Sequence, residues 1–154
     1  MGTVHALDAV ATTAFNDFVL AYDAFKAMTC VAANNLTGQQ LGGKALAPGV
    51  YCFDTTAALT TGTLTLDGPS NGIWVFQVGT GITTGTGSVA MINGGQPRNV
   101  FWQVGTAATI GTGTAFLGNI LAGSAITFTG ANTSLVGRAL AKTAVTMTGA
   151  LISQ

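Results

Sequence analysis

The chain has 154 residues, of which only 6% are charged, and its five basic and five acidic side chains cancel. An ordinary soluble domain is about 25% charged, so this composition offers no basic stripe for nucleic acid and no polybasic face for anionic lipid. The length suffices to bury one sizeable core. We therefore expect a single domain over residues 1–154, with no nucleic acid among its partners.

The mean hydropathy of the chain is high, at +0.52. No uncharged apolar run reaches the roughly 18 residues of a membrane span, so membrane insertion is not expected. The first residues lack the basic and apolar regions of a signal peptide. The repetitive, charge-poor composition is nevertheless typical of an extracellular protein, and we expect the protein to be secreted.

Residues 5–27 predict the one long helix. Apolar side chains recur there at steps of three or four residues, which places them on one side of a helix. The stripe consists of Leu7, Val10, Ala14, Phe18, Ala21 and Phe25, broadened by Phe15, Val19 and Tyr22. So wide a stripe indicates that the helix packs against another element along its length.

Glycine, asparagine and proline break up residues 31–48, which we interpret as a polar connector. Strand-like alternation starts at residue 49, so a solenoid is expected over about residues 49–153. Loops are expected at 67–72 and 93–98. The strands expected before the second loop are 49–53, 58–60, 63–66, 73–78, 80–88 and 89–92.

One short unit recurs in the second half of the chain. It reads TGIT at 80–83, TAAT at 106–109, SAIT at 124–127 and TAVT at 143–146. The later copies follow one another at offsets of 18 and 19 residues, and the first two are 26 apart because the loop at 93–98 intervenes. A period near 20 in a chain rich in glycine and threonine is typical of a solenoid whose turns stack over a shared core.

Within each copy, apolar and small polar residues alternate. Ile126 and Phe128 share one side of a strand, and Thr127 lies on the other, which predicts a half-buried strand. The outward side carries threonine, alanine and glycine where a solvent-facing strand usually carries charge. Stacked rungs lie about 4.8 Å apart, and alternate residues about 6.7 Å apart, so the outward side would form a regular, uncharged grid of hydroxyl and methyl groups.

Two other strand segments, 73–76 and 100–102, are apolar on both sides. A strand of this kind is usually covered on both faces. The helix is the free element with a large apolar stripe, so we place it outside these strands and leave the threonine-rich strands facing water. Trp74 and Trp102 share the inward side and are expected in the core rather than on a sugar-stacking platform.

Several segments resemble the large microbial ice-binding family, which is built as a discontinuous three-faced β-helix with an α-helix alongside. They are GTVHALDAV at 2–10, LAPGVY at 46–51, VFWQVG at 100–105, FLGNILA at 116–122 and GRALA at 137–141. The resemblance implies a mostly β, right-handed, three-faced β-helix with the helix on one face and an ice-binding surface on another, flat face. A Thr-Ala/Gly-x-Thr/Asn motif marks that surface, and the four repeats match it except that Ser124 replaces the first threonine.

The expected ice-binding residues are the threonines and one serine of the repeats and of the strand ends that follow them. They are Thr80, Thr83, Thr106, Thr109, Ser124, Thr127, Thr129, Thr143, Thr146 and Thr148. Rigid, evenly spaced hydroxyl and methyl groups can order water into an ice-like layer, whereas a charge would hold water in its own geometry. The alternative is that threonine serves only as a good outward strand residue.

The chain departs from the family in one respect, because family members carry a further segment before the helix. Its absence would leave a rung uncovered, with unpaired backbone and apolar surface. A homo-oligomer or filament then becomes possible, and a structural or adhesive subunit that assembles through the solenoid ends is the second function to consider.

Cys30 and Cys52 are the two cysteines of the chain. In an extracellular chain they are expected to form a disulfide, with two buried free thiols as the alternative. A metal site is not expected, because His5 is the only histidine, and no cofactor is implied. We do not expect an enzyme, since His5 has no nearby nucleophile and Asp54 and Asp67 stand at ordinary turn positions.

Overall fold

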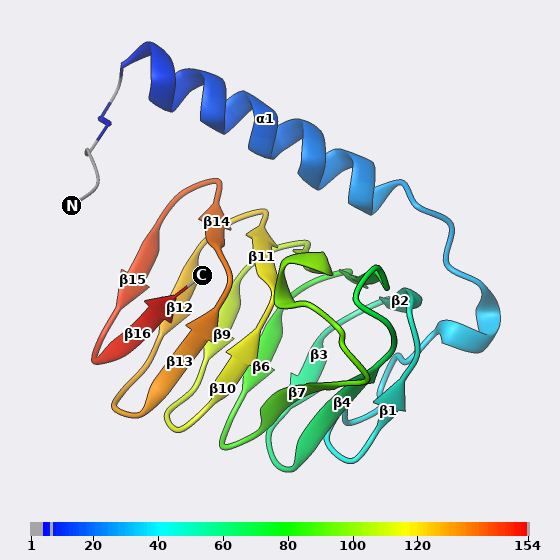
Figure 1. Cartoon of the computed structure of the whole chain (residues 1–154). Coiled ribbons are helices and arrows are strands. Elements are labelled where there is room, and N and C mark those ends of the chain that lie inside the picture. The colour runs from blue at the N-terminus through cyan, green and yellow to red at the C-terminus, as the bar shows by residue number, and fades with distance from the viewer. Residues whose placement is uncertain (1–4, 7, 154) are drawn as a thin grey trace.

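The computed structural model describes residues 5–6 and 8–153, and in these residues it shows three parallel β-sheets with one long helix alongside (Figure 1). Successive turns of the chain pass through the three sheets in order, so neighbours within a sheet come from successive turns. The expected mostly β, three-faced solenoid with a helix on one face is confirmed.

Each sheet is named here by a letter. Sheet A contains β2 (Gly49–Phe53), β5 (Trp74–Val78), β8 (Val100–Val104), β11 (Asn119–Ala122) and β14 (Ala139–Ala141). Sheet B contains β3 (Ala57–Leu59), β6 (Ile82–Thr84), β9 (Ala108–Ile110), β12 (Ile126–Phe128) and β15 (Val145–Met147). Sheet C contains β1 (Ala45–Leu46), β4 (Thr63–Asp67), β7 (Ser88–Ile92), β10 (Ala115–Leu117), β13 (Thr133–Val136) and β16 (Ala150–Ser153).

Helix α1 (Ala9–Lys26) is shorter than the expected range of 5–27. Asp8 caps it, because its Oδ1 accepts a hydrogen bond of 2.8 Å from the backbone N–H of Ala11, as an N-cap aspartate does. His5 lies before the helix, with its Nδ1 2.7 Å from Oδ2 of Asp8. The Ala11 hydrogen bond, followed by the contact with His5, lowers the pKa of Asp8. Leu7, expected in the helix, lies outside the described residues.

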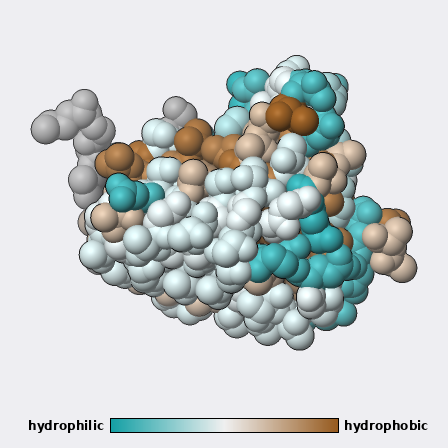
Figure 2. Space-filling model, turned by 90° about the horizontal axis from the view of Figure 1, so that it is seen from below, coloured by the Kyte–Doolittle hydropathy of each residue, from teal (hydrophilic) through white to brown (hydrophobic). Residues whose placement is uncertain are grey.

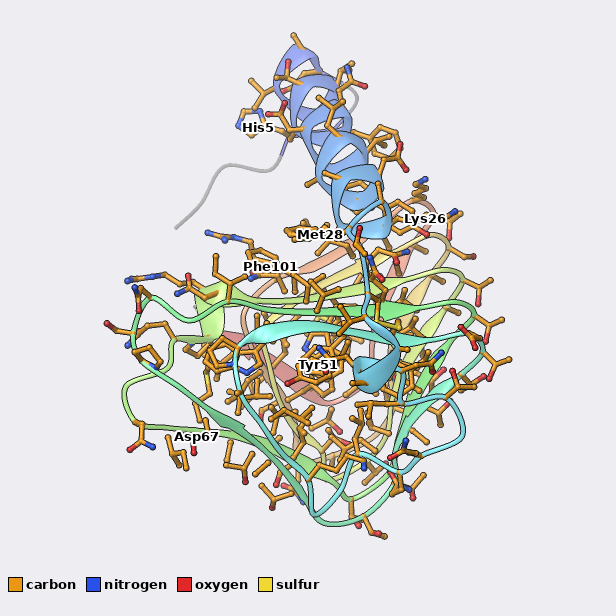
Figure 3. The ribbon with its side chains drawn as sticks, turned by 90° about the vertical axis from the view of Figure 1, so that its right-hand side faces the viewer. His5, Lys26, Met28, Tyr51, Asp67 and Phe101 are labelled. Atoms are coloured by element: carbon orange, nitrogen blue, oxygen red, sulfur yellow. A yellow bond between two sulfur atoms is a disulfide. The ribbon has the colours of Figure 1, made fainter. Side chains whose placement is uncertain are left out.

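The helix packs on the outer side of sheet A, as the double-sided apolar strands predicted. Phe18 and Tyr22 are its buried side chains and form a cluster with Leu121 of β11. Phe25 stacks on Phe101 of β8 with ring centroids 4.4 Å apart, and Figure 3 shows Phe101 on the side of the sheet nearest the helix. This second apolar cluster holds α1 against one face and leaves the other two faces uncovered by it.

Hydrogen bonds fix the two ends of this packing. The hydroxyl of Tyr22 donates to the backbone oxygen of Val104 at 3.2 Å. The side-chain amide of Gln77 donates to the backbone oxygens of Phe25 and Met28, both at 2.7 Å. Carbonyl groups at a helix end lack partners within the helix, so Gln77 ties the C-terminal end of α1 to β5.

The main core fills the interior between the three sheets. Trp74 and Trp102 are fully buried, which confirms their expected place in the core. Aromatic rings stack from rung to rung, with ring centroids 3.9 Å apart for Phe76 and Trp102 and 5.6 Å for Tyr51 and Phe76. Figure 3 shows Tyr51 inside the ring of strands. Identical strand positions therefore stack similar side chains, as a solenoid requires.

The interpretation of residues 31–48 as a connector alone is wrong. After the short 3-10 helix η1 (Ala32–Asn34), residues 35–46 form an incomplete first rung. Asn35 bridges to Cys52, Gln40 bridges to Ala58, and β1 pairs with β4. The glycines that suggested a connector stand at the corners of this rung, so the solenoid starts near residue 35 rather than 49.

Cys30 and Cys52 form a disulfide between the segment after α1 and strand β2. The bond closes a loop with a sequence separation of 22 residues, and in the chain-entropy picture such a loop contributes roughly 3 kcal/mol. It anchors the C-terminal side of the helix to the first complete rung. Within the described part of the chain, no helix has the length and apolarity to cross a membrane.

The core can be tested with two matched leucines. Leu64 of β4 is fully buried, whereas Leu20 of α1 is 70% exposed. Leu64→Ala is expected to lower the free energy of unfolding by about 2–5 kcal/mol, because it removes buried methyl groups and leaves a cavity. Leu20→Ala is expected to change it by less than about 0.5 kcal/mol. Guanidinium unfolding with the disulfide intact measures both, and equal losses would contradict the assignment of the interior.

Candidate functional site

The outward side of sheet B carries a central column of residues, one from each rung. The parallel register aligns Thr83 with Thr109, Thr109 with Thr127, and Thr127 with Thr146. Ala58 of β3 precedes them, aligned with Thr83. The side chains on either side of each threonine point inward, as in Ile126 and Phe128, which are fully buried. Four threonines therefore stand in line at the rung spacing of about 4.8 Å.

A second column runs along the corner where the chain passes from sheet A to sheet B. It consists of Thr55, Thr80, Thr106, Ser124 and Thr143. Backbone hydrogen bonds hold it together. The N–H of Thr106 donates to the oxygen of Thr80 at 2.7 Å, and that of Ser124 to the oxygen of Thr106 at 2.8 Å. The corner hydroxyl groups are therefore spaced by the backbone ladder in the same way as the strand residues.

Small residues separate these two columns. Thr56, Gly81, Ala107, Ala125 and Ala144 occupy the position after the corner residue in each rung. Their carbonyl groups accept hydrogen bonds from the previous rung, for example Ala125 from the N–H of Ala108 at 3.0 Å. Because alanine and glycine are short, the surface between the hydroxyl columns does not rise above them.

The far border of sheet B carries the remaining expected residues. Thr129 follows β12 and Thr148 follows β15, and both are exposed. Their N–H groups donate to the backbone oxygens of Ile110 at 2.9 Å and Phe128 at 3.1 Å. The border is less regular than the corner, since Gly85 and Gly111 occupy it in the middle rungs. We call these columns together the sheet B face.

All ten expected residues therefore lie on one face. Eight are exposed, and Ser124 and Thr127 are half-buried between neighbouring rungs. None of the columns contains an ionisable residue, and helix α1 lies on sheet A rather than here. Figure 2, seen from the side opposite the helix, shows a surface that is mostly near neutral in hydropathy, with hydrophilic residues gathered toward one end.

One threonine of the expected strand 80–88 has a different place. Strand β6 covers only Ile82–Thr84 of this range. Its last residue, Thr84, points inward and is 5% exposed. Its Oγ1 lies 2.8 Å from that of Thr114 and accepts a hydrogen bond of 2.9 Å from the N–H of Gly111. Threonine on these strands thus has two roles, which the alternation around Ile82 and Thr83 distinguishes.

The four sequence repeats do not include the first complete rung of this face. Thr55, Thr56 and Thr60 are exposed there and continue the columns. The segment TTAA at 55–58 stands 25 residues before TGIT, so its offset gave a usable signal. It lacks threonine at the fourth position, which is why the motif did not reveal it.

The hollows of the described surface lack a catalytic constellation. One of about 310 Å³ lies between the end of α1 and sheet A and is lined by Gln77, Gln103, Asp54 and Lys26 among others. Another of about 240 Å³ is lined by Arg98, Asn119 and Arg138 among others. Within the described residues, no group of three histidine, cysteine or acidic side chains could hold a metal ion. Asp67 lies at a corner of the solenoid (Figure 3).

These features define a β-solenoid whose most regular surface is the outer side of one sheet. The sequence model of the family described as Ice-binding-like matches residues 1–153. The chain belongs to this ice-binding-like family.

Named relatives agree with this assignment. An ice-binding protein of Nostoc sp. (strain HG1) is 46% identical over 130 residues, which is 83% of this chain and 47% of that protein. An ice-binding protein of Flavobacterium frigoris (strain PS1) is 34% identical over 137 residues, which is 81% of this chain and 49% of that protein. The chain therefore spans about half the length of these relatives.

Solved structures share the fold. An ice-binding protein from an Antarctic biological consortium superposes with a TM-score of 0.90 at 36% identity. The superposed region is 98% of this chain and 69% of that protein's chain. That of the Antarctic ascomycete Antarctomyces psychrotrophicus gives 0.89 at 34% identity, covering 99% and 75%. The architecture described above is thus that of ice-binding proteins.

The two orientations of threonine make a testable pair. Thr84→Val is expected to lower the free energy of unfolding by about 1–3 kcal/mol, because it leaves the buried N–H of Gly111 without its acceptor. Thr83→Val, one residue away on the exposed side, is expected to change it by less than about 0.5 kcal/mol. Thermal or denaturant unfolding compares the two variants. A larger loss for Thr83→Val would contradict the orientation of β6.

Proposed function

We propose that this protein binds ice through the sheet B face and thereby limits ice growth. The observation that carries the proposal is the central column, in which Thr83, Thr109, Thr127 and Thr146 are aligned by the parallel register. The corner column and the short alanine and glycine residues extend it into a two-dimensional surface. The names of the relatives support the same function.

The physical argument rests on order and on the absence of charge. Backbone hydrogen bonds between successive rungs restrict the threonine positions, so little entropy is lost when water is ordered over them. β-branched threonine has few side-chain rotamers, which presents its hydroxyl and methyl groups in a limited set of positions. A layer of water held at regular intervals can merge with a crystal, whereas an ionic group would impose its own hydration shell.

A structural or adhesive subunit, the second function considered from the sequence, is less well supported, because the relatives are named ice-binding proteins. We also propose that the protein acts outside the cell, since disulfides such as that between Cys30 and Cys52 persist in oxidising compartments. Ice binding without catalysis fits the surface chemistry of the sheet B face. Self-association remains a separate proposal.

The face can be blocked by one bulky side chain. Thr127→Tyr and Thr146→Tyr are each expected to remove most of the thermal hysteresis while leaving the fold intact, because the ring rises above the hydroxyl columns. Thr65→Tyr on the outward side of sheet C is the matched control and is expected to keep it. Hysteresis and ice shaping are measured with nanolitre osmometry, and circular dichroism checks the fold. Full hysteresis in both sheet B variants would remove this face from consideration.

Hysteresis is also expected to be insensitive to pH between about pH 5 and about pH 9, because the columns of the sheet B face carry no titratable group. Below this range Asp8 affects the stability of the fold, because its pKa in the folded protein lies below the ordinary value. Its contribution to stability is present above the unfolded pKa and is lost as the pH falls through the folded one. Osmometry across this range measures the effect.

A further inference from the structure

The turns that join sheet B to sheet C differ in length. They stack along one edge of the solenoid, beside the far border of the sheet B face (Figure 1). From Thr84 of β6 the chain reaches the next aligned position of sheet C, Ser88, four residues later. In the following rung it takes five residues, from Ile110 to Ala115. A residue inserted into one of two adjacent rungs interrupts the pairing between them, as a β-bulge does.

The backbone ladder between these two rungs is interrupted at the same point. Other neighbouring strands of sheet B pair over three residues, whereas β6 and β9 pair at only two positions. Thr84 and Ile110 are the residues left out. On the other side of the turn, β7 and β10 pair at one position, Ser88 with Ala115. This junction therefore has fewer paired residues than the junctions beside it.

The hydroxyl group of Thr84 replaces the missing ladder bond. At the equivalent border position of the next rung, the N–H of Thr129 donates to the backbone oxygen of Ile110 at 2.9 Å. The N–H of Gly111 donates instead to the side-chain Oγ1 of Thr84 at 2.9 Å. Because Thr84 is buried, this side chain supplies an acceptor where a backbone N–H could not be left unpaired without cost.

Hydrogen-bond counting gives the next contact a direction. Oγ1 of Thr84 lies 2.8 Å from Oγ1 of Thr114, which is fully buried. The hydroxyl of Thr114 donates to the backbone oxygen of Gly85. A threonine hydroxyl has a single proton, so Thr84 must donate to Thr114. A chain of hydrogen bonds, called here the hydroxyl relay, thus runs from the N–H of Gly111 through both hydroxyl groups to the carbonyl of Gly85, and such chains strengthen their members.

The two ends of the hydroxyl relay are border residues of the sheet B face in adjacent rungs. Gly85 directly follows β6, and Gly111 directly follows β9. Neither has a side chain, and a Cβ at either position would collide with the backbone of the rung before it, at Thr60 and Thr84 respectively. No side chain of these border residues can therefore hold the border from outside. The relay ties it from the interior.

A further inward threonine holds Gly111 from the other side. Its backbone oxygen accepts a hydrogen bond of 3.1 Å from Oγ1 of Thr133, which is 1% exposed. The turn of that rung is longer again, with six residues from Phe128 to Ser134. In both lengthened turns, the residue directly before the aligned position of sheet C is thus a buried threonine whose hydroxyl group binds a border carbonyl.

We propose that Thr84 and Thr114 are positioning residues for the sheet B face, because the hydroxyl relay fixes the spacing between the rungs of β6 and β9. Thr83 and Thr109 lie on these strands and are neighbours in the central column. Groups that meet a ligand need buried partners that hold them within about 0.5 Å. Without the relay the two rungs could separate at the border, and the column would lose its even spacing. This inference rests on the proposed ice-binding function.

Thermal hysteresis of Thr114 variants tests the positioning role. Thr114→Val keeps the shape of the side chain but removes the hydroxyl group. It is expected to lose about half of the hysteresis, because two of the four threonines in the central column lie on the strands that the relay joins. Thr114→Ser keeps the hydroxyl group and is expected to retain most of the hysteresis.

Leu64→Ala is the matched control, since Leu64 is fully buried and outside the relay. It is expected to lower the stability at least as much as Thr114→Val and yet to keep full hysteresis. Hysteresis is compared at equal concentrations of folded protein, which circular dichroism at the assay temperature verifies.

The hydroxyl relay itself is tested without ice by combining Thr84→Val with Thr114→Val. Thr114→Val alone leaves the hydroxyl of Thr84 without its acceptor, but it cannot do so once Thr84 is valine. The guanidinium midpoint of the double variant is therefore expected to fall by less than the sum of the two single shifts. Additive shifts would overturn the relay.

Full hysteresis in Thr114→Val, an equal loss in Leu64→Ala, or a Thr114→Ser as impaired as Thr114→Val would overturn the positioning role. Thr127→Tyr separates the possible failures. If Thr127→Tyr loses hysteresis while Thr114→Val keeps it, the proposed function stands and the positioning role is wrong. If both keep it, the proposed function fails, and the positioning role fails with it.

Discussion

The parallel register between successive rungs is the constraint on which the rest of this structure depends. Once Thr109 is aligned with Thr127 by backbone hydrogen bonds, every position of one rung lies beside the same position of the next. Aromatic rings such as Phe76 and Trp102 then stack inside, and hydroxyl groups repeat outside. A shift of one residue in any rung would exchange the inward and outward sides of that strand, so the core and the sheet B face depend on the same register.

The three sheets have different environments because only one of them receives the helix. Sheet A is apolar on both sides, and Phe25 and Phe101 join it to α1. Sheet B is apolar inside and carries threonine, alanine and glycine outside, which leaves it bare. Sheet C changes from Thr63 to Leu151 along its length. Helix α1 thus covers the outer side of sheet A, and the bare sheet B face is the surface proposed to meet ice.

The low content of charged residues affects the whole surface of the molecule. With 6% charged residues, the polar part of the surface consists mainly of threonine, serine and backbone groups rather than of ions. Regularly spaced hydroxyl groups can hold a layer of water in an ordered arrangement. Ordering water in this way is the proposed role of the sheet B face.

The sequence by itself determined the solenoid, the helix, and the orientation of residues such as Thr127 and Trp102, because periods of 20, 3.6 and 2 are properties of the chain. It did not determine the first rung, since residues 35–46 have no repeat and are held by pairing with β2, β3 and β4 and by the burial of Leu36 and Leu41 in the core. Tertiary structure also decided that Val145 and Met147 are exposed although their positions are inward ones. Burial at these positions depends on whether another rung lies beside them, and no local pattern records that neighbour.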